Sequence, residues 1–165
     1  MNSNQPEWPD LQPGDCLGYF SRDIIDYAIA FKTWTRLAHV EVYEGEGMSV
    51  ASRNGIGVNR YPLRKTDIAV IRRPLGKIDF DAAKNWFEAR ARHEKYDWKG
   101  LLCFTLAVRQ GSMDRMYCSE FMLRWYRAGN FQPLDPDWDA DWTPPAFILV
   151  PPTFETFWKN PNWNP

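Results

Sequence analysis

One cysteine and one histidine have the residue types and local settings that nucleophilic catalysis needs. Cys118 opens a helical pattern over residues 117–123, and His39 opens a strand pattern over residues 38–43. A thiol at a helix N-terminus lies among unpaired backbone N–H groups and at the positive end of the helix dipole, which favour the thiolate. An imidazole beside that sulfur would complete a cysteine nucleophile. The alternative for Cys118 is a small packed residue, because free cysteines are usually buried.

The strand that His39 opens has two different faces. Side chains two apart on a strand share a face, so His39, Glu41 and Tyr43 are expected on one side and Val40 and Val42 on the other. A polar trio in front of an apolar pair suits the wall of a cleft. It also suits an edge strand that is exposed to solvent, and both interpretations stay open.

The other histidine and cysteines are expected to have structural roles. His93 lies in a charged helix end, residues 90–95, where it would interact with the helix dipole or with solvent. Cys16 and Cys103 lie within apolar runs and are expected to pack. An odd count of three cysteines without metal-type spacing predicts reduced thiols, no disulfide framework and no metal site, and no cofactor is expected.

The first half of the chain predicts a small, mostly antiparallel meander. A turn at residues 13–15 leads into a short buried strand, residues 16–20, and Ser21 can cap a helix that runs to about Trp34. Residues 37–44 and 48–52 read as a hairpin, since the glycines in Gly45-Glu46-Gly47 can take positive φ. Two further strands are expected at residues 56–61 and 67–72.

The second half predicts helices followed by an irregular tail. Asp79 or Asp81 can cap a helix through about His93, a helical stretch covers residues 98–108, and the cysteine helix runs from Cys118 to about Ala128. The prolines and tryptophans after residue 130 predict a surface wrap, with an edge strand at residues 147–150.

Composition predicts one globular domain over residues 1–165, with a core at about 11–128 and the wrap at about 130–165. Of its 165 residues, 44% are hydrophobic and 25% charged, with a net charge of −1. That balance gives no basic excess for nucleic acid or for anionic membranes. No apolar run reaches the roughly 18 residues of a membrane span, and the start lacks a signal-peptide pattern, so a cytoplasmic protein is expected by default.

Four short motifs together resemble a known family, the circularly permuted branch of the NlpC-type papain-like cysteine hydrolases. This branch includes YiiX-like proteins and relatives of lecithin retinol acyltransferase. The motifs are Pro13-Gly14-Asp15, His39-Val40, Tyr96-Asp97-Trp98 and Cys118-Ser119-Glu120. The order is that of the family with its last two motifs moved to the front, and the resemblance spans residues 11–128.

The resemblance implies a papain-like α+β fold, with Cys118 as nucleophile, His39 as base and Tyr96 beside the oxyanion. The family usually places a third polar residue twelve positions after the histidine, which is Ala51 here. A one-residue bulge would supply Ser52 instead, and Ser49 lies on the same strand. Glu41 is another candidate, although neighbours two apart on one strand rarely reach each other's ring nitrogens. A working pair without a third member, or a fold without activity, also stays open.

The implied function is a cysteine amidase or endopeptidase that cleaves an amide bond through a thioester, with cell-wall peptide (peptidoglycan) as the default substrate. A cell-wall target would require lysis, specialised export or a phage particle, because no export signal is seen. The same residues would serve an acyltransferase or thioesterase on lipids, which predicts an apolar tunnel beside Cys118. A non-catalytic binding or structural module is the third alternative. The oligomeric state is not predicted.

Overall fold

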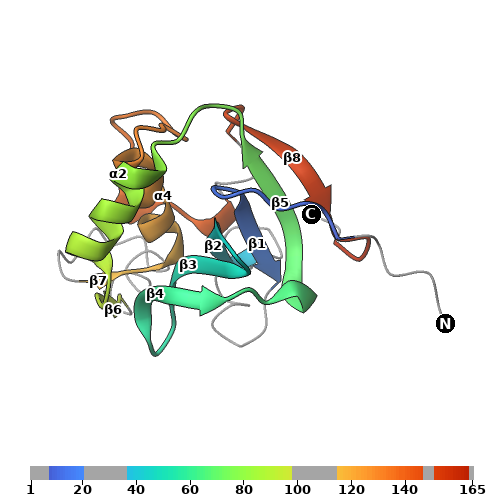
Figure 1. Cartoon of the computed structure of the whole chain (residues 1–165), viewed down its shortest axis with the longest axis horizontal. Helices are drawn as coiled ribbons and strands as arrows, with labels where there is room; N and C mark the ends of the chain where they lie inside the picture. Colours follow the sequence, from blue (N-terminus) through green and yellow to red (C-terminus); the bar gives the residue numbers. More distant parts are fainter. Residues whose placement is uncertain (1–7, 21–36, 98–114, 147–150, 164–165) are drawn as a thin grey trace.

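A computed structural model of the chain describes residues 8–20, 37–97, 115–146 and 151–163, and all structural statements concern these residues. They form an α+β fold in which an antiparallel sheet packs against helices, as expected (Figure 1). Several predictions lie outside the described residues, namely the helices at 21–34 and 98–108, the strand at 147–150 and the packing of Cys103.

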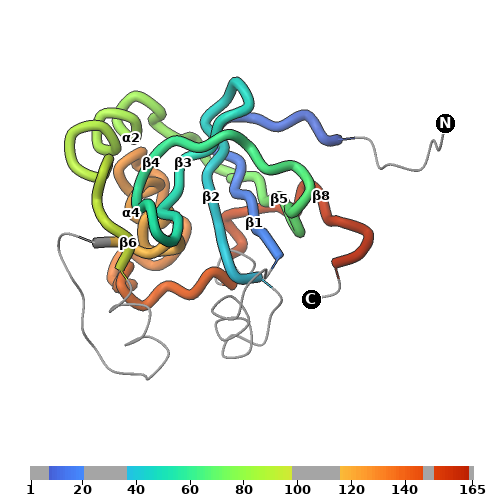
Figure 2. Tube along the Cα trace, turned by 90° about the horizontal axis from the view of Figure 1, so that it is seen from below, coloured from blue at the N-terminus to red at the C-terminus, as the bar shows by residue number. Residues whose placement is uncertain are grey.

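Six antiparallel strands form the main sheet, in the order β4-β3-β2-β1-β5-β8. The tube in Figure 2 follows β1, β2, β3 and β4 side by side across it. The strands are β1 (Cys16–Phe20), β2 (Leu37–Gly45), β3 (Met48–Arg53), β4 (Gly57–Pro62), β5 (Ile68–Pro74) and β8 (Phe154–Lys159). The first five agree with the predicted strands to within a few residues.

The β2–β3 hairpin forms at the predicted glycines. Gly45, Glu46 and Gly47 all have positive φ, at 112°, 52° and 73°. This left-handed backbone is readily available to glycine, so the two glycines on either side of Glu46 let the chain reverse there. The turn fixes which face of β2 carries His39 and Glu41, because one residue of slip would exchange the two faces.

The predicted meander is wrong for β5, which does not pair with β4. It pairs with β1 on one side and with β8 on the other. Ile68, Ala69, Val70 and Ile71 are all at most 1% exposed. An apolar run of this kind is buried on both faces and suits the interior of a sheet, so β5 lies between two neighbours.

The tail is more regular than the predicted wrap. It contributes the edge strand β8 and a short 3₁₀ helix, η3 (Ala140–Trp142). The Pro-rich stretch therefore completes the main sheet at its β5 side. Another 3₁₀ helix, η1 (Lys65–Asp67), connects β4 to β5.

Two helices, α2 and α4, lie on the same side of the molecule, beside the β2–β4 part of the sheet (Figure 1). In α2 (Phe80–Trp86), the Asp79 side chain accepts a bond from the backbone N–H of Ala82, so Asp79 is the N-cap. The helix continues as a π-helical turn, η2 (Phe87–Ala91), and ends before His93, whose φ is 74°. The predicted end at His93 is thus two residues too late.

The cysteine helix, α4 (Cys118–Ala128), has the predicted bounds, and Gly129 is its C-cap. Its apolar face packs on the sheet in the main core cluster. Phe121, Met122 and Trp125 of α4 join Val40 and Val42 of β2 there, and all five are at most 2% exposed. A short parallel pair that was not predicted, β6 (Lys95–Tyr96) and β7 (Arg115–Met116), leads into α4.

Candidate active site

Cys118 is the first residue of α4, where the expected helix begins. Tyr117 takes the N-cap position with extended backbone and makes no side-chain cap bond. The first-turn N–H groups of a helix have no partner within the helix and carry the positive end of its dipole. Cys118 is only 2% exposed, so its sulfur lies at this helix end and away from bulk water.

His39 lies beside this cysteine, from the start of β2. Cys118 is among the neighbouring groups that shift the pKa of the imidazole, so the two side chains lie close together. The other contact is from Nε2 to Oε1 of Glu41, at 3.0 Å.

The surroundings of His39 favour its protonated form. Burial alone would lower the pKa of the imidazole, but Cys118 and Glu41 outweigh burial and raise the pKa of His39 to about 9. The cause is the stabilisation of the imidazolium by these two neighbouring groups.

Glu41 is buried at 0% exposure and receives bonds on both carboxylate oxygens. Besides His39, the donors are Arg53 (2.8 and 3.1 Å), Arg64 (3.2 Å), Ser49 (2.5 Å) and Tyr19 (3.1 Å). Burial would raise the pKa of Glu41, but the bonds from His39 and Arg53 hold it well below its ordinary value. Glu41 is therefore an ionised acceptor that fixes the orientation of the His39 ring.

The contact between His39 and Glu41 is one that neighbours two apart on one strand were expected to make only rarely. Both side chains lie on one face of β2, and the donors around Glu41 hold its carboxylate toward His39. Ser52 has a different partner, since its hydroxyl donates to the Met116 carbonyl at 2.5 Å. Ser49 bonds Glu41 rather than the imidazole.

Tyr96 lies next to the chain that enters α4. It is paired with Met116 across β6 and β7, two residues before Cys118. Its role beside the oxyanion remains a prediction.

A segment far along the sequence holds the start of α4 in place. The Tyr117 hydroxyl donates to the Asp141 carbonyl at 2.5 Å, and the Ser119 hydroxyl donates to the Thr143 carbonyl. Arg124, one turn further along α4, bonds the Asp141 carboxylate at 2.7 Å. Residues on both sides of Cys118 are therefore anchored to η3 and the residue after it. No pattern in the sequence predicts this contact.

Glu120 adds little negative charge to the helix end. It is 2% exposed, and burial raises its pKa to about 8, with Asp141 adding to the rise and Arg124 opposing it. At neutral pH its carboxyl group is mostly protonated.

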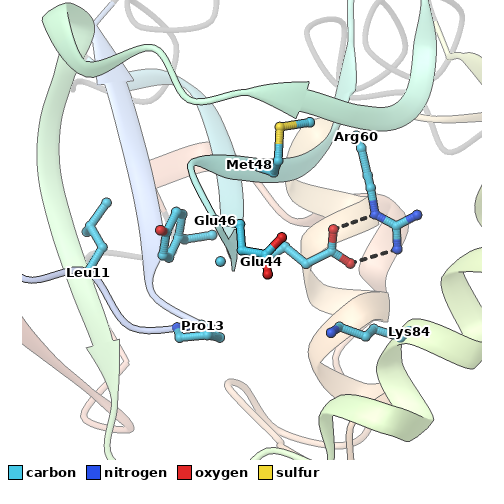
Figure 3. Close-up of a pocket in the computed structure, with 9 residues that line it drawn as sticks. Leu11, Pro13, Glu44, Glu46, Met48, Arg60 and Lys84 are labelled. Atoms are coloured by element: carbon cyan, nitrogen blue, oxygen red, sulfur yellow. Dashed lines mark hydrogen bonds and ion pairs between the residues drawn. The ribbon is translucent and has the colours of Figure 1, made fainter.

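A separate pocket of about 590 Å³ lies at the other end of β2 (Figure 3). Tyr43, Met48 and Lys84 are among its lining residues, and Glu44 there bonds Arg60 at 2.5 and 2.8 Å. His39 lies six positions before Gly45 along the strand, a length of roughly 20 Å. The pocket is thus distinct from the Cys118 site.

The described residues include no group of three or more His, Cys, Asp and Glu side chains that could hold a metal ion. Within those same residues, no helix combines the length and apolar character needed to cross a membrane. His93 is exposed, and Cys16 is fully buried against Met122, with 3.5 Å between their sulfurs, as expected for structural roles.

No family model matches the sequence, and no curated protein matches it. The fold does match a solved structure, described as the crystal structure of metalloprotein yiiX from Escherichia coli O157:H7, DUF1105. The TM-score is 0.68 with 16% sequence identity, over 93% of this chain and 98% of that one. A likeness at this identity concerns the fold alone. The chain thus has a fold similar to that of YiiX.

Proposed function

We propose that this protein is a cysteine hydrolase in which Cys118 is the nucleophile, His39 the acid and base, and Glu41 the residue that orients His39. The observation that carries the proposal is the continuous chain of contacts from Cys118 through His39 to Glu41 at the start of a helix. A thiol, a base and a third group that orients the base form the arrangement used for covalent acyl transfer. The YiiX-like fold is compatible with such chemistry.

The proposed reaction has two halves. The Cys118 thiolate attacks the substrate carbonyl carbon, a carbon–sulfur bond forms, and the carbonyl electrons move onto oxygen. Collapse of this intermediate breaks the carbon–nitrogen bond, the leaving amine takes the proton from His39, and a thioester remains. Water then gives a proton to His39 and attacks the thioester, which releases a carboxylic acid and restores the thiolate–imidazolium pair.

The oxyanion of each half reaction would be bound by donors at the start of α4. The backbone N–H of Cys118 is a first-turn group of the helix, so it has no acceptor within the helix. We assign Tyr96 as a second donor because its strand runs beside β7, which leads to Cys118.

An amide substrate fits this site better than a lipid. Glu41 contacts the His39 ring, and Arg53 and Arg64 bond that same carboxylate, so charged groups lie next to the site. Such surroundings suit a polar substrate, and cell-wall peptide is the default by analogy with the family. An acyltransferase acting on lipids would require an apolar channel at Cys118.

A burst experiment tests the proposal without knowledge of the natural substrate. With p-nitrophenyl acetate, we expect one equivalent of nitrophenolate per protein in a fast phase, and one acetyl group on Cys118 by peptide mass mapping. His39→Ala should slow the fast phase by about 10² to 10⁴, the range for a lost general base. Digestion of a peptide library followed by mass spectrometry then identifies the amide bond that is cleaved.

Two controls define the outcome. Cys118→Ala should lose the burst completely, whereas Cys16→Ala should keep it, because Cys16 is buried in the core. If wild type and Cys118→Ala release nitrophenolate at the same slow rate, Cys118 is not a nucleophile and the chain is a non-catalytic module.

A further inference from the structure

Two arginines share one carboxylate next to His39. Arg53 and Arg64 both bond Glu41, and the only polar side-chain contacts that the described residues offer to either guanidinium are with this carboxylate. The two cations come from different elements, β3 and the connection between β4 and η1. Two positive charges therefore face one negative charge.

The surplus positive charge does not depend on the state of the catalytic pair. Cys118 and His39 are neutral together as thiol and imidazole, and they are also neutral together as thiolate and imidazolium. Glu41 then balances only one of the two arginines. Counted over the described residues that contact one another here, the net formal charge is about +1 in either state.

Arg64 carries this surplus, whereas Arg53 is the partner of Glu41. Arg53 bonds the carboxylate twice, at 2.8 and 3.1 Å, and its side chain is 17% exposed. Arg64 makes one longer bond of 3.2 Å, and its side chain is 33% exposed. The Nε of Arg64 is buried and has no hydrogen-bond partner among the residues that the structure describes.

Arg64 is nevertheless held in place beside the reacting groups. Its guanidinium lies 4.6 Å from the centre of the Tyr19 ring, a cation–π contact. Its Nη2 and the Nε2 of His39 bond the same oxygen, Glu41 Oε1, so the two side chains are near neighbours. A planar cation that is fixed, partly exposed and incompletely bonded is suited to a carboxylate ligand.

We propose that Arg64 is a specificity residue that binds a carboxylate of the substrate, close to the acyl group that Cys118 attacks. This inference rests on the proposed function and names its substrate class, an acyl compound or peptide with a free carboxylate near the cleaved bond. One surplus positive charge matches the single charge of a carboxylate, whereas a phosphate monoester carries about −1.5 to −2 at pH 7.

The test compares two alkylating reagents of the same length that differ by one charge. N-iodoacetylglycine carries a carboxylate and N-iodoacetylglycinamide does not, and both transfer their methylene carbon to sulfur with loss of iodide. We expect wild-type Cys118 to react about tenfold faster with the carboxylate reagent, relative to their ratio on free cysteine, as a unit charge within about 10 Å would give. Arg64→Gln should abolish this preference, and Arg64→Lys should retain most of it.

Lys65→Gln is the matched control, because it removes one positive charge at the next residue. Its ammonium lies 5.7 Å from the Trp8 ring instead of at Glu41, so the preference should persist. If wild-type Cys118 shows no preference for the carboxylate reagent, the inference is overturned, whether or not the variants fold. Equal slowing of both reagents in Arg64→Gln would also overturn it, since Arg64 would then only position Glu41. Failure of the proposed function would instead appear as no burst with p-nitrophenyl acetate.

Discussion

At the residue scale, Glu41 links the stability of the fold to the chemistry of the site. It is a fully buried carboxylate, and its bonds reach a histidine, two arginines, a serine and a tyrosine. A buried charge of this kind is tolerated only when its partners satisfy it. The same bonds that satisfy Glu41 also set the orientation of the His39 ring.

Glu41→Gln should therefore change both stability and the His39 titration. Removing one partner of a buried ion pair costs about 3 to 5 kcal/mol. We expect the free energy of unfolding, measured with urea, to fall by an amount near the lower end of this range. The pKa of His39 should fall, because an amide does not stabilise the imidazolium as a carboxylate does. NMR titration reads this directly, since the chain has only two histidines and His93 serves as an internal reference.

Glu44→Gln is the matched control for this prediction. Glu44 lies on the same strand and forms its own ion pair with Arg60, but it does not contact His39. Its substitution should destabilise the protein while leaving the pKa of His39 unchanged. An unchanged His39 titration in Glu41→Gln would show that Glu41 has only a structural role.

At the element scale, the start of β4 packs closely against the segment that leads into β6, and this contact helps to position the chain before α4. The backbone N–H of Val58 donates to Glu94, and that of His93 donates to Val58, so β4 holds the segment that leads into β6. β6 pairs with β7, and β7 ends two residues before Cys118. Gly57 lies at the contact, and a Cβ built on it would be 2.1 Å from the Glu94 carbonyl oxygen.

Gly57→Ala should destabilise the protein more than Gly55→Ala. Both glycines have positive φ, at 93° and 79°, so both substitutions incur the backbone cost of about 1 to 2 kcal/mol. A Cβ at Gly55 has nothing within 4 Å, whereas at Gly57 it collides with backbone. Urea unfolding should show the difference, and alkylation of Cys118 should slow in Gly57→Ala alone. Equal losses of unfolding free energy in the two variants would mean that the segment around Glu94 shifts away from the new Cβ without an energetic cost.

At the scale of the whole molecule, the site joins parts of the chain that are far apart in sequence. His39 comes from the sheet, Cys118 from a helix packed on it, and the contacts that hold the helix start come from residues 141–143 of the tail. The tail also completes the sheet through β8. Global stability and the state of the site are therefore coupled.

This coupling predicts a pH dependence of stability. The pKa of His39 is about 6.5 in an unfolded chain and is raised to about 9 in the fold. The folded state then binds the extra proton between these values, so the contribution of His39 is complete below about pH 6.5 and is lost as the pH rises through 9. The difference in unfolding free energy between wild type and His39→Gln should shrink over this range. If this difference in unfolding free energy stayed constant with pH, the raised pKa of His39 in the folded state would be contradicted.

The sequence by itself determined the local elements and the two residues of greatest chemical interest. The strand patterns at residues 16–20 and 37–53, the turn at Gly45-Glu46-Gly47 and the bounds of α4 depend on spacing and on backbone preferences of nearby residues. Such preferences act within a few positions and can be read from the printed chain. Cys118 and His39 were identifiable because each opens such an element.

Only the tertiary structure decided which partners these residues meet. The placement of β5 beside β1, the strand in the tail and the anchoring of Tyr117 and Ser119 depend on contacts between distant segments. Glu41 was a weak candidate from the sequence, because strand spacing alone does not bring its carboxylate to the His39 ring. The arginines, serine and tyrosine that hold it there come from four other positions in the chain. Burial of a charge requires all of these partners at once, and only the assembled fold provides them.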